Sequence, residues 1–175
     1  MAKINGVEIK NLKSFLDHEE CLCYQGNVYL NGKKLGFWSQ GSWGGPDIFS
    51  FDETLLDDAC NSFYEGTPES HPSRFVFKEK DVFMSKVVDI KEIEKTCRKL
   101  FKKGCPAVYY ATDGFHYSWM GVPDISIDDI RNKFAKEYKE MAKTMFKSGY
   151  KEKVFTPESF DLIVDKMHPA EEFYL

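Results

Sequence analysis

Apolar and polar residues alternate on both sides of Asn31-Gly32, and this pattern predicts a β-hairpin. Asn-Gly favours a two-residue type I′ turn because both central residues need a positive φ. We expect this hairpin and the loop after it, residues 24–47, to organise the rest of the chain. A regular ladder from the turn pairs Leu30 with Lys33, Val28 with Leu35, Gly26 with Phe37 and Gln25 with Trp38.

The register assigns each residue of this hairpin to a face, because successive side chains of a strand point to opposite sides. One face is mostly apolar and should lie on the core. The other mixes amide, basic and aromatic groups and should face solvent, together with the loop that carries Trp43. The expected core face carries Tyr24, Val28, Leu30, Leu35 and Phe37, and the outer face carries Gln25, Asn27, Tyr29, Lys34 and Trp38.

Apolar residues at intervals of three and four predict four helices. In the first, Leu55 and Leu56 should face inward, and in the second Asp89 with Glu92 resembles a capping box. Residues 81–88 before that cap fit either a strand or the start of the helix. The expected helices run from Asp52 to Gly66, from Asp89 to Gly104, from Ser126 to about Ser148 as the longest, and from Thr156-Pro157 onward.

Further alternating stretches predict strands. The second hairpin should turn at Asp113-Gly114, which pairs Val108 with Trp119. Its bulky residues on one face and small residues on the other predict a central position in the sheet, with a helix packed close. Three further strands are expected. One follows the turn at Asn5-Gly6 and ends at Ile9, one spans Arg74 to Lys78, and one spans Tyr150 to Phe155. Together these elements predict one α+β domain over residues 1–175, mainly an antiparallel sheet of about five to seven strands with four helices.

Composition narrows the class of protein. A length of 175 residues is typical of one domain with a good core. No apolar run approaches the roughly 18 residues of a membrane span, and the N-terminus does not resemble a signal peptide. We therefore expect a cytoplasmic protein without a membrane partner. The five cysteines form no C-x-x-C pair and the four histidines lie far apart, so we expect buried free thiols, no metal site and no cofactor.

Charge is segregated along a chain of net charge −4. Residues 51–75 and the C-terminal segment are acidic, whereas residues 76–105 and 126–153 are basic. This segregation favours a charged macromolecular partner, although solvated helix faces also produce it. The basic residues near the end of the second expected helix have a partial structural explanation in the helix macrodipole, and they are Lys95, Arg98, Lys99, Lys102 and Lys103.

Two groups of residues are candidates for binding. Lysines recur opposite the apolar stripe of the third expected helix, where they could neutralise phosphates or merely solvate the helix. Aromatic residues of the first hairpin and its loop should be at least partly exposed, and could contact a protein, stack on unpaired bases or pack beneath a loop. The candidate binding residues are Tyr29, Lys34, Trp38, Trp43, Lys136, Lys139, Lys143 and Lys147.

Catalysis has weaker candidates. His18 and Glu19 offer a base and a carboxylate on a loop, and His116 could form an acid–base cluster with its strand neighbours. Each histidine also fits an ordinary surface or core position. Gly44-Gly45 is not a phosphate loop, because no lysine and helix start follow it. The sequence therefore favours a binding protein over an enzyme.

The N-terminal third resembles small proteins of Gram-positive bacteria, their phages and mobile elements. The resemblance rests on Gly6 to Asn11, on YQGNVYLNGKKLGFWSQ and on the Trp-Gly-Gly-Pro-Asp loop, and covers roughly residues 4 to 52. It implies an anti-CRISPR protein that inhibits the type II effector nuclease or depletes its guide RNA. The expected partner is then a protein or ribonucleoprotein complex, or RNA itself. An RNA-cleaving or guide-RNA-trimming enzyme and an intracellular protein–protein adaptor remain the alternatives.

Overall fold

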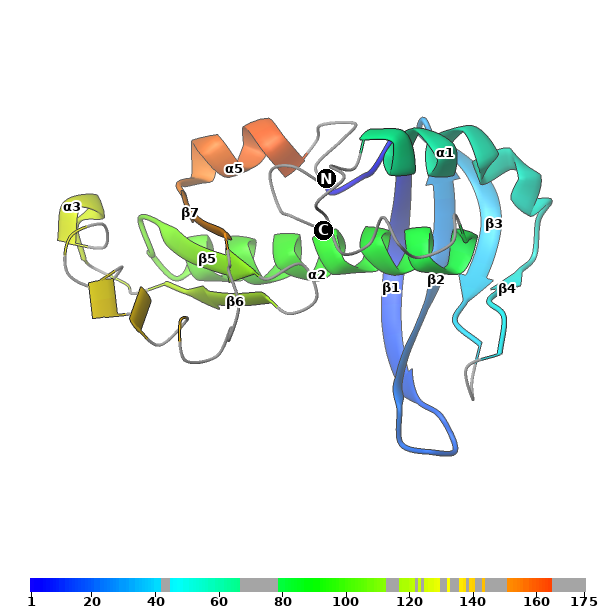
Figure 1. Ribbon diagram of the computed structural model, residues 1–175, viewed down its shortest axis with the longest axis horizontal. Helices are drawn as coiled ribbons and strands as arrows, with labels where there is room; N and C mark the ends of the chain where they lie inside the picture. Colours follow the sequence, from blue (N-terminus) through cyan, green and yellow to red (C-terminus); the bar gives the residue numbers. More distant parts are fainter. Residues whose placement is uncertain are drawn as a thin grey trace.

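Two antiparallel sheets and a long helix form the molecule (Figure 1). The computed structural model describes residues 1–41, 45–66, 79–112, 117–121, 123, 125–129, 132, 136–137, 139–140, 143 and 151–164. The first sheet has the order β1-β2-β3-β4, and the second has the order β6-β5-β7. The strands are β1 (Val7–Leu16), β2 (Leu22–Leu30), β3 (Lys33–Ser39), β4 (Ile48–Phe49), β5 (Val108–Thr112), β6 (Tyr117–Met120) and β7 (Lys151–Phe155).

Helices cover the apolar faces of these sheets. Figure 1 shows α2 running along the molecule, with the first sheet towards one end and the second towards the other. Within the described ranges, no helix combines the length and the hydropathy needed to cross a bilayer. The helices are the 3₁₀-helix η2 (Glu53–Leu56), α1 (Asp57–Gly66), α2 (Lys80–Lys102), α3 (Ile127–Asp129) and α5 (Pro157–Val164).

The α+β class is found, but the expectation of a single sheet of five to seven strands with four helices is wrong. β5 pairs on one side with β6 and on the other with β7, so neither of its edges is open to the first sheet. β5 is central and buried throughout, whereas β6 is an edge strand, so the predicted central position holds only for the first strand of the second hairpin. The expected strand at 74–78 and most of the expected helix at 126–148 lie outside the described residues.

α2 begins nine residues before the expected cap at Asp89, which is the second correction. Asp89 lies within the helix, and the true N-cap is Glu79, whose side chain makes no capping bond. The apolar spacing of Phe83, Val87 and Ile90 continues through this region, and all three side chains are 0% exposed. The predicted end is confirmed, because Gly104 has φ +86° and its N–H donates to the carbonyl of Phe101.

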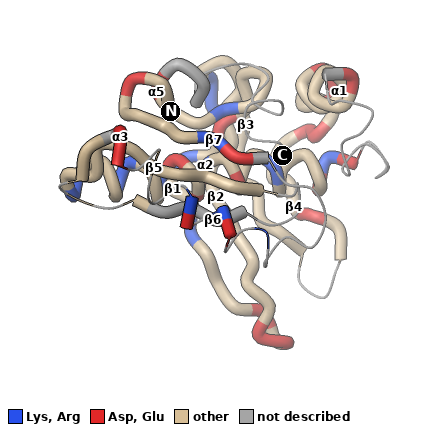
Figure 2. The backbone as a smooth tube through the Cα atoms, turned by 60° about the vertical axis from the view of Figure 1, so that its left-hand side comes forward, with Lys and Arg blue, Asp and Glu red and all other residues tan. Residues whose placement is uncertain are grey.

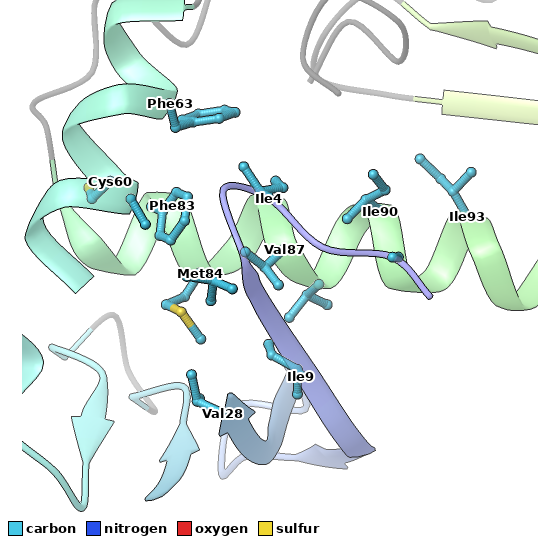
Figure 3. Packing of buried hydrophobic residues seen from close by; sticks show 14 of the residues in the cluster. Ile4, Ile9, Val28, Cys60, Phe63, Phe83, Met84, Val87, Ile90 and Ile93 are labelled. Carbon is cyan, nitrogen blue, oxygen red and sulfur yellow. The ribbon is translucent and has the colours of Figure 1, made fainter. Parts of the chain in front are cut away.

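One core joins α2 to the strands. Figure 3 shows Met84 and Val87 of α2 beside Ile9 and Val28 of the first sheet. Farther along the same core, the ring of Phe160 in α5 lies 5.5 Å from that of Phe155 in β7. A buried helix face of this length stabilises the fold by removing apolar surface from water. The expected inward position of Leu55 is wrong, because this residue is 50% exposed at the end of η2.

Two tight turns lie side by side at one end of the first sheet. Asn5 and Gly6 have φ 49° and 81°, and Asn31 and Gly32 have the same pair of values. Both turns were predicted from Asn-Gly, and both have the positive φ angles of type I′. The backbone N–H of Asn31 donates to the carbonyl of Gly6 at 2.9 Å, which joins the turns. The side chain of Asn5 donates to the carbonyl of Ala59 in α1 at 2.8 Å.

The hairpin registers differ from the expected ones. In the first hairpin, Tyr29 pairs with Lys34 but Val28 pairs with Gly36, so Leu35 is an extra residue that forms a β-bulge. In the second, Tyr110 pairs with Trp119, a shift of two residues that leaves 113–116 to connect the strands. A bulge is invisible in an alternating pattern, and its extra residue shifts every later pair of the ladder.

Candidate nucleic-acid interface

The second half of α2 carries a stripe of basic side chains. Its members follow one another at steps of four, three, one and three residues, which places them within about 100° of the helix circumference. The stripe is about 16 Å long at 1.5 Å per residue. The opposite side carries the buried Ile93 and Cys97, so the core fixes the direction of the stripe. The stripe consists of Lys91, Lys95, Arg98, Lys99 and Lys102.

This stripe lines a hollow of about 710 Å³. The apolar wall of the hollow is formed by the N-terminal Met1 and by Leu12, which belongs to β1. Lys103 adds a further cation to the lining. Six basic and two acidic residues line the hollow in total, so its net charge is strongly positive. The acidic residues are Glu92 and Glu94.

Glu94 neutralises only part of this charge. Its carboxylate accepts hydrogen bonds from Lys91 Nζ at 2.7 Å, Arg98 Nε at 2.9 Å and the backbone N–H of Ala2 at 2.9 Å. Burial alone would raise the pKa of Glu94, but these three donors together outweigh it and lower the pKa to about 2. The side chain therefore remains an anion at neutral pH and fixes Lys91, Arg98 and the N-terminus in place.

Arg98 also has a structural role. Its Nη2 lies 2.9 Å from Asp161 Oδ1 in α5, and its guanidinium lies 5.8 Å from the ring centroid of Phe160. These contacts hold α5 against α2. Arg98 is consequently less available to an anion than the lysines beside it.

Two lysines at the end of the stripe, and Lys103 next to them, are available to a ligand. Lys99, Lys102 and Lys103 are exposed, and none of them forms an ion pair with another residue in the described part of the chain. Lys95 contacts Glu92 at 3.2 Å, but its side chain is 72% exposed, and such surface pairs exchange readily. The C-terminal part of α2 can therefore bind phosphate groups without first breaking buried contacts.

The expected position of Trp38 is wrong. Its side chain is 0% exposed and lies in the core, whereas Phe37, expected in the core, is 41% exposed. The bulge at Leu35 causes this exchange, because it changes which of the two neighbouring residues points inward. Tyr29 and Lys34 do lie on the outer face, and Lys10 Nζ lies 4.3 Å from the Tyr29 ring centroid. Trp43 lies outside the described residues.

Trp38 instead links the end of β3 to Asp47, which precedes β4. Its indole Nε1 donates to Asp47 Oδ2 at 2.7 Å, and the N–H of Gly41 donates to Asp47 Oδ1 at 3.3 Å. Partial burial, with a smaller contribution from the nearby Asp81, raises the pKa of Asp47 to about 6. The aromatic residue predicted to bind a partner therefore holds both ends of its loop together.

Much of the charge of the predicted lysine stripe is neutralised. Lys139 Nζ lies 2.7 Å from Glu152 Oε1, and Lys143 Nζ lies 2.8 Å from Glu140 Oε1. Lys136 is exposed and lines a shallow hollow with Glu140. Lys147 lies outside the described residues. Lys99 and Lys102 of the α2 stripe have no such carboxylate partner within the described residues, so the α2 stripe is the better candidate for binding phosphates.

Of the catalytic candidates, the structure describes only His18 and Glu19. His18 and Glu19 are exposed at the tip of the β1–β2 hairpin, which extends beyond the body of the molecule (Figure 1). Neither lines the hollow beside α2. His116 lies outside the described residues. No group of three or more His, Cys, Asp or Glu side chains that could hold a metal ion occurs in the described ranges.

The sequence contained part of the signal for the α2 site. The sequence indicates a basic cluster that the helix macrodipole explains only in part, and it consists of Lys95, Arg98, Lys99, Lys102 and Lys103. Lys91 extends this cluster in the structure. The contributions of Met1 and Leu12 depend on tertiary structure and have no sequence signal. Comparisons with protein-family models, with curated proteins and with solved structures found no match.

Proposed function

We propose that this protein binds the RNA of a nucleic-acid-guided defence complex through the basic stripe of α2, and thereby inhibits the complex. The observation that carries the proposal is the set of exposed lysines beside the hollow, of which Lys99, Lys102 and Lys103 have no ion pair within the described residues. Cations in a row along a helix displace counterions from several phosphates at once, which makes binding favourable and dependent on salt.

The nature of the target comes from the resemblance of residues 4–52 to proteins of phages and mobile elements. Inhibition of a type II effector, or depletion of its guide RNA, would take place in the host cytoplasm. A ribonucleoprotein presents RNA phosphates beside basic protein surface. The positive charge of the α2 stripe complements the RNA phosphates.

The tip of the β1–β2 hairpin could contact the basic protein surface of such a complex. Its turn contains Asp17, Glu19 and Glu20, which are red at the end of the projecting hairpin in Figure 2. Leu16 and Leu22 pair directly behind this turn, and their side chains are 65% and 57% exposed. Acidic and apolar groups on a projecting element can contact a basic protein while α2 contacts its RNA.

Target cleavage by the effector tests the proposal. The purified protein is added to the assembled effector and its guide RNA, and the RNA is then analysed on a denaturing gel. We expect target cleavage to stop while the guide RNA stays intact. The variant with Lys99, Lys102 and Lys103 replaced by Gln should require a higher concentration for the same inhibition.

A control of equal charge replaces Lys136, Lys139 and Lys143 by Gln. Two of these lysines have carboxylate partners, so this variant should inhibit more strongly than the α2 variant. Shortened guide RNA would contradict inhibition by binding and would indicate an RNA-cleaving enzyme. Normal target cleavage with intact RNA would contradict the proposal and favour an adaptor.

A further inference from the structure

The outer face of the first sheet is hollowed beside an exposed aromatic ring. The hollow has a volume of about 520 Å³ and extends over β1, β2 and β3. Phe37 forms one wall with a side chain that is 41% exposed. The polar groups that line the hollow are the primary amides of Asn11, Gln25 and Asn27 and the ammonium of Lys13. The site thus combines an aromatic face with several hydrogen-bonding groups.

The strand register determines how these groups face one another. Asn27 is the direct partner of Phe37 on β3, and Gln25 is the direct partner of Lys13 on β1. Side chains of directly opposed residues have Cβ atoms about 5 Å apart. The two amides on β2 therefore lie between the ring and the ammonium, within the dimensions of one nucleotide.

The amides in this hollow have unused hydrogen-bonding capacity. Within the part of the chain that the structure describes, the side chains of Asn11, Gln25 and Asn27 make no hydrogen bond to another residue. A primary amide offers two donor hydrogens and a carbonyl acceptor, so it can bond to the edge of any base. In folded RNA such edges are accessible where bases are unpaired.

We propose that this hollow binds an unpaired nucleotide of single-stranded RNA. The base stacks on Phe37, its edge bonds to the amides of Asn27 and Gln25, and its phosphate lies by Lys13. Stacking on an exposed ring is the usual way in which proteins hold single strands. The inference rests on the proposed function and specifies the RNA structure that the protein recognises.

The two hollows share one lining residue. Leu12 lines both the basic hollow beside α2 and the hollow beside Phe37. It lies in a bulge where the register shifts between Lys10 and Lys13, on the edge strand of the sheet. One RNA strand can therefore pass from the lysines of α2 around this edge to the ring of Phe37.

The surroundings favour RNA over a protein segment. Lys13 and Lys34 are exposed on this face, and neither forms an ion pair with a described residue. Glu8, an acidic residue of the same strand face, already contacts Lys10 at 2.9 Å. The unpaired charge around the hollow is consequently positive, which complements a phosphate backbone.

Binding of two labelled RNAs tests the proposal by fluorescence anisotropy. One is a single-stranded oligouridylate of about 12 nucleotides, a length within the range that single-strand-binding surfaces cover. The other is a duplex RNA of the same length, whose bases are already stacked. We expect Phe37→Ala to weaken binding of the single strand about fivefold or more, from the loss of one stacked base. Duplex binding should be unchanged.

Two control variants separate stacking from general effects. Phe37→Tyr keeps the ring and should bind the single strand as the wild type does. Ile48→Ala removes another exposed apolar side chain from β4, 64% exposed and outside the hollow, and should have no effect. Urea unfolding of each variant verifies that it folds.

The outcomes distinguish this proposal from the proposed function. Unchanged single-strand binding by a folded Phe37→Ala variant would overturn the nucleotide site, even if replacing Lys99, Lys102 and Lys103 weakened both RNAs. Weakening by Phe37→Ala alone would support the nucleotide site and contradict the role of α2. A wild-type protein that bound neither RNA would overturn both.

Discussion

Single residues fix the turns on which the first sheet depends. Gly6 and Gly32 share φ +81°, a conformation that residues with a Cβ rarely adopt. Their surroundings differ, because a Cβ on Gly6 would lie 2.2 Å from Asn31 Oδ1 whereas a Cβ on Gly32 would meet nothing within 4 Å. Gly6 is therefore required by both its conformation and its close neighbour.

Substitution of the two glycines by alanine separates these contributions. We expect Gly32→Ala to lower the free energy of unfolding by about 1 kcal/mol, from backbone strain alone. Gly6→Ala should lower it by about 2 kcal/mol or more, because Asn31 must also move and its bond to the Gly6 carbonyl is disturbed. Urea unfolding measures both. Equal losses would contradict the close approach of the two turns.

Glu94 links stability to pH. Its folded pKa of about 2 lies below the ordinary value of 4.5, so its contribution is fully present above pH 4.5 and is lost as pH falls towards 2. Glu94→Gln should cost about 2 kcal/mol at pH 7, because Lys91 and Arg98 lose a buried anion. The difference from the wild type should shrink on acidification.

Glu92→Gln is the matched control for Glu94→Gln. It makes the same substitution two residues earlier, where the carboxylate contacts the exposed Lys95. Its effect on unfolding should be small, because exposed ion pairs contribute little. If Glu92→Gln lowered the free energy of unfolding as much as Glu94→Gln does, the larger contribution assigned to the buried hydrogen bonds of Glu94 would be contradicted.

At the scale of elements, the extra residue in β3 decides which aromatic side chain is buried. A variant that retains Trp38 alone, with Trp43 and Trp119 replaced by Phe, should resist quenching by acrylamide because the indole is fully buried. Its donation to Asp47 should also hold the indole in place. Quenching as efficient as that of an exposed tryptophan would contradict the bulge and would favour the regular strand pairing that the sequence predicts.

The predictable elements were those with strong local signals. Asn-Gly turns, the glycine that ends α2 and the threonine–proline start of α5 all act through neighbouring residues. At that start the N–H of Ser159 donates to Thr156 Oγ1 at 3.2 Å. The bulge at Leu35 and the separation of the two sheets depend on contacts distant in sequence, which an alternating pattern does not contain.

At the scale of the whole molecule, α2 connects structure to the proposed function. Its apolar side joins the two sheets through one core, and its basic side remains exposed because that core fixes the helix orientation. The helix that carries the stripe from Lys91 to Lys102 is therefore already ordered, so binding a row of phosphates orders the lysine side chains but not the backbone. Binding should depend strongly on salt.

The salt dependence of guide-RNA binding tests this account most directly. Affinity is measured by anisotropy at several salt concentrations for the wild type and for the variant with Lys99, Lys102 and Lys103 replaced by Gln. Three lost phosphate contacts should reduce the slope of log K against log salt by about two units, at roughly 0.7 per contact with a single strand. A variant that folds normally and keeps the wild-type slope would contradict the account.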